Sequence, residues 1–202
     1  MICQLLTINI RMILAKPFQL ENLKTIQEII LDFLSKKHID YDRSDVYNGW
    51  VDELMSIKII SEEINKVLPT FEILGMGLII MKPYGTMPIH SDTSDWVLDD
   101  RGDINLNGTY AFNIPILNYE NTFTSFYESS KDPEFAMDTN LSDNDEPQAY
   151  FRYDEDCCRE IHRIEMSQPH LINTKVPHCG HNPNPTPRIL LNVRFNPNSE
   201  TL

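Results

Sequence analysis

Hydrophobic and polar positions follow two different periods along the chain, and the change falls near Pro69. Before it, apolar residues recur every three or four positions over residues 19–37 and 52–67, the spacing of a helix with one buried face. After it, apolar and polar residues alternate in short runs bounded by Pro, Gly, Asn and Asp, which is typical of strands. The pattern predicts two helices that pack against a β structure.

The second part of the chain holds the predicted strands. They cover residues 71–82, 109–117, 122–128, 160–165, 170–174 and 188–195. Several short strands after two helices favour an antiparallel sandwich or barrel that is covered on one face. The length of 202 residues fits a single domain. We therefore predict one mainly β domain with flanking helices, in which residues 1–70 form a helical support and residues 71–195 form the core.

Acidic side chains are concentrated in one part of the predicted core. The chain carries 30 acidic and 17 basic residues, a formal net charge of -13, and residues 129–160 contain ten of the acidic and three of the basic ones. The first half of this stretch shows little periodicity, so we expect an acidic insertion that forms a long surface loop, either a lid or a solvated segment. The overall acidity argues against nucleic acid as a partner, because phosphate backbones bind basic surfaces.

The sequence indicates neither a membrane span nor secretion. The longest apolar run, Ile73–Met81, has nine residues, about half of the length that a bilayer-spanning helix needs. The first 18 residues lack a basic start and a small-residue cleavage site. The cysteines show neither a disulfide framework nor zinc spacing: they are Cys3, Cys157, Cys158 and Cys179. We expect a reduced, cytoplasmic protein.

A histidine and an aspartate follow the first predicted strand, in the string KPYGTMPIHSDTSD. His90 and Asp92 are two positions apart, and in an extended backbone such positions point to the same side. An imidazole nitrogen and a carboxylate oxygen can then converge on one metal ion. On its own this pair is a weak signal, since an exposed turn is the common alternative.

The string LINTKVPHCGHNPNPTPRILLNVRF near the C-terminus adds candidate ligands and a predicted strand. His178 and His181 are both candidates for a third metal ligand. The strand divides into two faces: Ile189, Leu191, Val193 and Phe195 on one, and Arg188, Leu190, Asn192 and Arg194 on the other. If the apolar face packs on the helices, the two arginines face the interior, where an anionic ligand or nearby carboxylates would pair with them.

Together, the two strings resemble the signature of the Fe(II)/2-oxoglutarate-dependent dioxygenases. That signature is His-x-Asp, a distal His, and an Arg or Lys about ten residues later. His90-Ser91-Asp92 matches its first part, and His178 precedes Arg188 by ten residues, whereas His181 precedes it by seven. The resemblance implies that His90, Asp92 and His178 bind iron, with no further catalytic residue, and that Arg188 binds 2-oxoglutarate. His181 is then a loop residue near the site.

The strings YAFNIPIL and LINTKVPH resemble hydroxylases of the phytanoyl-CoA, aspartyl and prolyl type. The resemblance implies a double-stranded β-helix, also called a jelly roll or cupin barrel, over residues 71–195, with the metal near its mouth. It also implies an oxidoreductase that uses O2 to hydroxylate a substrate while 2-oxoglutarate becomes succinate and CO2.

The sequence departs from the family pattern in one place. Many members carry a serine two residues after the arginine, and this chain has Leu190 there. The candidates for the missing donor are Asn192, Arg194, Thr124 and Tyr84. We also expect Asn113 to face the cavity as a further co-substrate contact. Arg194 is expected to be structural, through a salt bridge near the far end of the barrel from Arg188.

Two other functions stay open, a metal-binding cupin with non-redox chemistry and a jelly-roll binding protein without catalysis. The substrate could be a small molecule or a protein side chain, and the acidic stretch would favour a basic one. The sequence predicts no oligomeric state.

Overall fold

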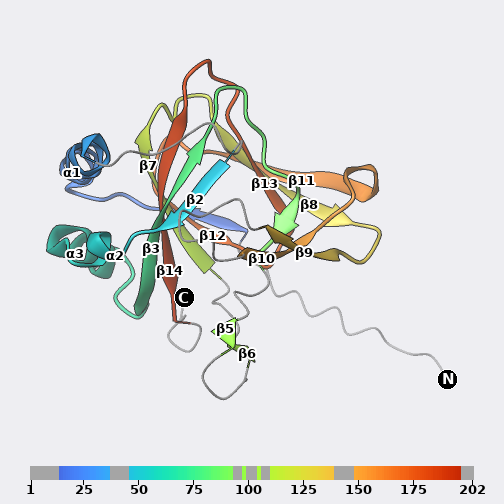
Figure 1. Cartoon of the computed structure of the whole chain (residues 1–202), viewed down its shortest axis with the longest axis horizontal. Helices are drawn as coiled ribbons and strands as arrows, with labels where there is room; N and C mark the ends of the chain where they lie inside the picture. Colours follow the sequence, from blue (N-terminus) through green and yellow to red (C-terminus); the bar gives the residue numbers. More distant parts are fainter. Residues whose placement is uncertain are drawn as a thin grey trace.

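The computed structural model describes residues 14–36, 46–92, 97–98, 104–105, 110–138 and 148–196. Two six-stranded antiparallel sheets make up most of this part of the chain, and the helices lie together on one side of the molecule (Figure 1). A short pairing of β5 (Val97–Leu98) with β6 (Ile104–Asn105) stands apart from both sheets. The mainly β fold with flanking helices is as predicted.

The first sheet contains most of the predicted strands. In order across the sheet, its members are β1 (Ala15–Pro17), β12 (His170–Asn173), β7 (Tyr110–Leu117), β14 (Arg188–Phe195), β3 (Ile73–Met81) and β2 (Val46–Trp50). β14 is central and pairs with both β3 and β7. This places Arg188 and Arg194 in the middle of a sheet rather than at an edge.

The second sheet is built from shorter and more polar strands. In order, they are β11 (Cys158–Glu165), β8 (Phe123–Ser129), β13 (His178–His181), β4 (His90–Ser91), β10 (Gln148–Arg152) and β9 (Glu134–Asp138). The short helix η1 (Glu155–Cys157) leads into β11. From β11 to β14 the chain alternates between the sheets, which is the arrangement of a jelly roll.

The core lies between the first sheet and the helices. These are α1 (Leu23–Ser35), α2 (Asp52–Met55) and α3 (Lys58–Val67). α1 buries Ile26, Ile30 and Leu34, which recur every four residues and therefore share one face. They join the apolar row of β14, whose members Ile189, Leu191, Val193 and Phe195 all lie in the same core cluster. Because strand residues alternate, Arg188, Asn192 and Arg194 must face the other sheet.

The second predicted helix is divided into α2 and α3. The break falls at Ser56 and Ile57, where the Ser56 hydroxyl donates to the Glu53 carbonyl at 2.6 Å and Ile57 is extended. A serine that binds the backbone of the preceding turn competes with helix continuation.

Glu63 of α3 fastens this helix to the start of α1. The Asn22 backbone N–H donates to its Oε2 at 3.0 Å, the Asn22 side-chain amide donates to Oε1 at 2.9 Å, and Lys66 pairs with Oε1. The ion pair with Lys66 and the bonds from Asn22 lower the pKa of Glu63 to about 2. The carboxylate is therefore buried in its charged form with its hydrogen bonds made.

The structure adds strands where loops or helices were expected. β1 and β2 lie within the N-terminal support and extend the first sheet. β9 and β10 lie within residues 129–160 and pair with each other, and β10 also pairs with β4. The loop predicted for the first half of this stretch, residues 129–148, is wrong for β9, whereas β10 lies almost entirely beyond it. Residues 139–147 lie outside the described ranges.

None of the helices within the described ranges has both the length and the apolarity needed to cross a bilayer.

Candidate metal centre

The predicted metal ligands come from two neighbouring strands of the second sheet. His90 begins β4, Asp92 follows this strand, and His178 begins β13. The antiparallel pairing of these strands sets His178 directly opposite His90, and such partners project from the same face of a sheet. Their ring centroids are 4.4 Å apart. Residues 88 positions apart in sequence are therefore brought together by backbone pairing.

His90, Asp92 and His178 form the one cluster of potential metal ligands found within the described part of the chain, and we call it the His-Asp-His cluster. One donor atom from each residue lies within 4.8 Å of the other two. His90 Nε2 is 3.3 Å from Asp92 Oδ1. Both histidines are buried, and the Asp92 side chain is 17% exposed. The three groups can thus converge on one ion at the inner face of the second sheet.

Backbone carbonyls orient both imidazole rings. Nδ1 of His90 lies 2.9 Å from the Pro88 carbonyl, and Nδ1 of His178 lies 2.9 Å from the Val176 carbonyl. A carbonyl only accepts hydrogen bonds, so each Nδ1 carries a proton and donates it. The lone pair of a neutral ring is then on Nε2, which is the usual way in which an outer contact prepares a histidine to bind metal.

Charge in the cluster favours a cation. Burial raises the pKa of Asp92, but the positive charge of Arg194 and the bond from His90 outweigh this effect and hold it well below its usual value. Burial lowers the pKa of His90, but the hydrogen bond and charge of Asp92 outweigh it and raise the value. Burial lowers the pKa of His178 to about 4. The ionised Asp92 and the neutral His178 are in the state that binds a metal ion, whereas His90 releases its Nε2 proton when a metal takes its place.

The structure places His178 in the cluster and His181 away from it. Residues alternate along β13, so His178 and Gly180 face the interior while Cys179 and His181 face the other way. The His181 ring stacks on Phe123 with a centroid distance of 4.4 Å. The preference for His178, which came from the spacing to Arg188, agrees with this geometry.

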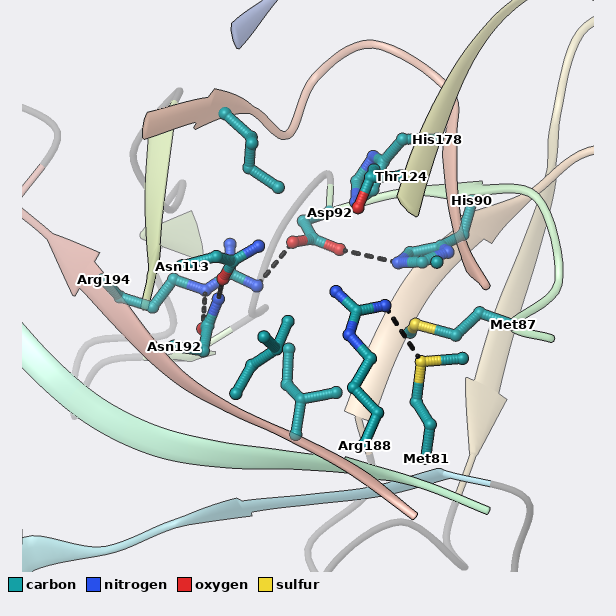
Figure 2. Close-up of a pocket in the computed structure, with 14 residues that line it drawn as sticks. Met81, Met87, His90, Asp92, Asn113, Thr124, His178, Arg188, Asn192 and Arg194 are labelled. Carbon is teal, nitrogen blue, oxygen red and sulfur yellow. Dashed lines mark hydrogen bonds and ion pairs between the residues drawn. The ribbon is translucent and has the colours of Figure 1, made fainter. Parts of the chain in front are cut away.

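Arg188 lies in an interior pocket between the two sheets, whose lining includes all three members of the His-Asp-His cluster. The guanidinium group points from β14 toward the cluster and lies beside Met81 and Met87 (Figure 2). Arg188 is 1% exposed. Its Nη1 donates to the His181 carbonyl and to Met81 Sδ, each at 3.4 Å.

Within the described residues, the Arg188 guanidinium has no carboxylate partner, and its Nε has no hydrogen-bond partner. Burial alone lowers the pKa of Arg188 to about 9. Gly180 keeps the space in front of the guanidinium clear, since a Cβ at this position would lie 3.5 Å from Arg188 Nη1 and 3.3 Å from Met87 Sδ. The pocket thus holds a buried positive charge that lacks an anion.

Arg194 is placed differently from the prediction. It does form an ion pair, but its Nη2 donates to Asp92 Oδ2 within the same pocket. The expected salt bridge is therefore present, but the expectation that it lies near the far end of the barrel is wrong. Arg188 and Arg194 are six positions apart on β14, but spacing along one strand does not tell which residue of the opposite sheet each side chain meets.

Of the other candidates for contact with a ligand, three line the pocket and one does not. Asn113 and Asn192 are each 4% exposed and bond to each other, with Asn192 Nδ2 donating to Asn113 Oδ1 at 2.6 Å. Thr124 of β8 also lines the pocket. Tyr84 is 71% exposed, which removes it as a donor to a buried ligand. Met81 and Met87 were not predicted as pocket residues.

The donor set suits a first-row divalent metal. Two imidazole nitrogens and one carboxylate oxygen on one side, with other positions open, are the ligand set of non-haem Fe(II) oxygenases. The interior pocket, with an uncompensated guanidinium, lies on the open side. The residues present therefore fit an Fe(II) ion together with an anionic ligand that reaches Arg188.

The sequence matches no family model, and a search of curated proteins finds no match. Solved structures do resemble the chain. The non-heme alpha ketoglutarate dependent carbocyclase SnoK from nogalamycin biosynthesis is 11% identical with a TM-score of 0.52, over 90% of this chain and 78% of that one. The viral collagen prolyl hydroxylase vCPH from Paramecium Bursaria Chlorella virus-1 is 12% identical with a TM-score of 0.48, over 90% and 95%.

An oxalate oxidase in complex with glycolate is more distant, at 10% identity and a TM-score of 0.39 over 83% of this chain and 59% of that one. Of these three, the similarity to SnoK is high enough to bear on the fold. It shows that the two sheets have the jelly-roll arrangement found in that 2-oxoglutarate-dependent enzyme, as the sequence predicted.

Proposed function

We propose that the protein is an Fe(II)- and 2-oxoglutarate-dependent dioxygenase. Its metal would be held by His90, Asp92 and His178, and the distal carboxylate of 2-oxoglutarate by Arg188. The observation that carries the proposal is the buried guanidinium of Arg188, which shares a pocket with the His-Asp-His cluster and has no carboxylate partner in the described part of the chain.

Arg188 requires an anion of a particular shape. An uncompensated buried charge is costly, and binding an anion removes that cost. The planar guanidinium group suits a carboxylate, which it can hold through two parallel hydrogen bonds. The pocket lining also includes Met81 and Leu190, whose apolar side chains suit a short methylene chain. A dicarboxylate with one end at Arg188 and the other at the metal meets all of these conditions.

The residues of the cluster prepare the site before any ligand arrives. The carbonyls of Pro88 and Val176 hold the imidazole rings with Nε2 toward the interior. Arg194 keeps Asp92 ionised. Bound Fe(II) would supply O2 activation, which couples conversion of 2-oxoglutarate to succinate and CO2 with oxidation of a substrate. The protein contributes position, orientation and exclusion of water.

The oxidised product is proposed to be a hydroxylated compound. SnoK is described as a carbocyclase, so a related site can lead to a different outcome. The substrate, a small molecule or a protein side chain, stays a prediction, and so does the absence of nucleic acid and membrane partners.

The test is a coupled-product assay. Purified protein with Fe(II) and 2-oxoglutarate in air should form succinate, and Asp92→Ala should form none. Arg188→Ala should form little at low 2-oxoglutarate, whereas Arg159→Ala, an exposed arginine paired with Glu128 on the second sheet, should match the parent. Metal binding without succinate formation would favour the non-redox cupin, and absence of metal binding would favour the binding protein. Either result contradicts the proposal.

A further inference from the structure

A chain of polar contacts runs through the interior pocket and ends on the proposed metal ligand Asp92. Arg194 Nη2 donates to Asp92 Oδ2, and Arg194 Nε donates to Asn192 Oδ1 at 2.9 Å. Asn192 Nδ2 then donates to Asn113 Oδ1 at 2.6 Å. In Figure 2 these side chains lie in sequence beside the cluster, on the side away from Met81 and Met87. The proposed function uses Arg194 for its charge beside Asp92 and does not use Asn192.

Register explains why the four residues meet. Asn192 and Arg194 are two positions apart on β14 and share its inner face. Asn192 is directly opposite Asn113 of β7. Asp92 follows β4 of the facing sheet, so the bond from Arg194 crosses the interior between the sheets. The Arg194 and Asp92 side chains are 12% and 17% exposed, and both asparagines are 4% exposed.

The direction of every bond in this chain is fixed by the arginine. A guanidinium group only donates hydrogen bonds, so the atom of Asn192 that faces Arg194 must be its oxygen. The Asn192 amide nitrogen then faces Asn113, and the atom of Asn113 that meets it must be an oxygen. The remaining end of the Asn113 amide is therefore an N–H donor, and Asn113 lines the pocket.

At the other end of this chain of contacts, Arg194 binds one of the two carboxylate oxygens of Asp92. It holds Oδ2, while Oδ1 lies 3.3 Å from His90 Nε2, on the side where the donor atoms converge. Asp92 can then offer a metal one oxygen and not two. A carboxylate that bound through both oxygens would fill one of the positions that an incoming ligand requires.

We propose that Arg194 is a positioning residue with two roles: it holds Asp92 so that one carboxylate oxygen faces the metal, and through Asn192 it turns the Asn113 amide so that its N–H group faces the co-substrate. The inference rests on the proposed function, because it assumes a metal at the His-Asp-His cluster and an anionic ligand in the pocket.

The test separates the two roles with Mn(II), whose binding needs no turnover. Arg194→Gln removes the charge that holds Asp92 and should weaken Mn(II) binding by about tenfold or more, the usual effect of losing an outer contact of a metal ligand. Arg194→Lys should restore most of the Mn(II) affinity, because an ammonium can hold Asp92. It should not restore 2-oxoglutarate affinity, because it lacks the planar fork that also reaches Asn192.

The asparagines give a second test that does not depend on whether the Arg194 variants fold. Asn192→Leu and Asn113→Leu should each leave Mn(II) affinity unchanged. Each should weaken 2-oxoglutarate binding to the Mn(II) form by about 2- to 10-fold, the value of one hydrogen bond. The double variant should lose no more than either single variant, because both changes remove the same donor.

Several results would overturn the inference. Mn(II) binding by Arg194→Gln at parental affinity removes the first role, and parental 2-oxoglutarate affinity of Asn192→Leu removes the second. Loss of both affinities in Arg194→Lys, together with a lower melting temperature, would assign Arg194 a merely structural role. If the parent protein binds neither Mn(II) nor 2-oxoglutarate, the proposed function itself fails. If it binds both and the variants behave like it, this inference alone fails.

Discussion

Glu63 and Arg188 are both charged and almost completely buried, 2% and 1% exposed, yet their surroundings are opposite. The oxygens of Glu63 receive hydrogen bonds from the backbone and side chain of Asn22 and pair with Lys66. Arg188 has a backbone carbonyl and a thioether as its hydrogen-bond acceptors within the described ranges. One charge is balanced by the protein, and the other is not.

The pKa shifts express the same contrast. The Lys66 and Asn22 contacts lower the pKa of Glu63 to about 2, which means that the fold stabilises its charged form. Burial lowers the pKa of Arg188 to about 9, which means that the fold destabilises its charged form. A buried charge that the fold balances is a structural contact between α1 and α3. A buried charge that the fold leaves unbalanced indicates a ligand.

The largest expected effect concerns the metal that would lie beside Arg188. Asp92→Ala removes the one anionic ligand of the His-Asp-His cluster, and Fe(II) or Mn(II) binding should fall by more than about 100-fold. Equilibrium dialysis with metal analysis measures the loss. Asp32→Ala, which changes an exposed aspartate on α1, is the matched control. Parental metal affinity in Asp92→Ala would show that the cluster is not the metal site.

For Glu63, the comparison predicts that substitution lowers the stability of the protein without weakening 2-oxoglutarate binding. Glu63→Gln keeps the shape of the side chain but removes the charge that pairs with Lys66. We expect it to lower the free energy of unfolding by about 1.5–3 kcal/mol, the range for hydrogen bonds to charged groups. Urea denaturation gives this value. An unchanged midpoint would mean that Glu63 does not fasten α1 to α3.

For Arg188, the comparison predicts that substitution changes the free energy of unfolding in the opposite direction. Arg188→Met replaces an unbalanced charge with an apolar side chain among Met81, Met87 and Leu190. The ligand-free protein should become more stable by about 1–2 kcal/mol, because the cost of burying the charge disappears. Urea denaturation in ligand-free buffer measures the difference. If Arg188→Met is as destabilising as Glu63→Gln, Arg188 belongs with the structural charges and the comparison fails.

The smallest expected effect is the loss of the stabilising contribution of Glu63 at low pH. The pKa of Glu63 is lowered from 4.5 to about 2, so the folded protein binds fewer protons at this residue than the unfolded chain. Its contribution to stability is therefore present above about pH 4.5 and is lost as the pH falls toward 2. The stability difference between the parent and Glu63→Gln should shrink over that interval. A difference that stays constant from pH 5 to pH 3 would contradict the assignment.

The sequence predicted best where alternation was strict and unbroken. β14 was predicted at residues 188–195 and is found there, because its apolar and polar rows are complete. The strand that carries His90 has two residues and the one that carries His178 has four, which is too short for periodicity to detect. The His90–Asp92 spacing indicated a shared face, but His178 was preferred over His181 through the family spacing to Arg188.

The sequence could not predict contacts between segments that are far apart along the chain. The bond from Arg194 to Asp92 joins residues 102 positions apart, and nothing in either string indicates it. Glu63 was also missed, since it lies on a helix pattern in which charged positions are read as exposed. The alternation of a strand can indicate which charged residue is buried. The partner of that residue depends on which strands face each other.

The central claim is that the unbalanced charge of Arg188 is completed by 2-oxoglutarate. The most direct measurement is calorimetric titration of 2-oxoglutarate into the Mn(II)-loaded parent, Arg188→Met and Glu63→Gln under anaerobic conditions. A charge-assisted carboxylate contact in a buried site is worth about 2–4 kcal/mol, or about 30- to 1,000-fold in affinity. We predict that loss for Arg188→Met and parental affinity for Glu63→Gln. Equal binding by the parent and Arg188→Met would contradict the account.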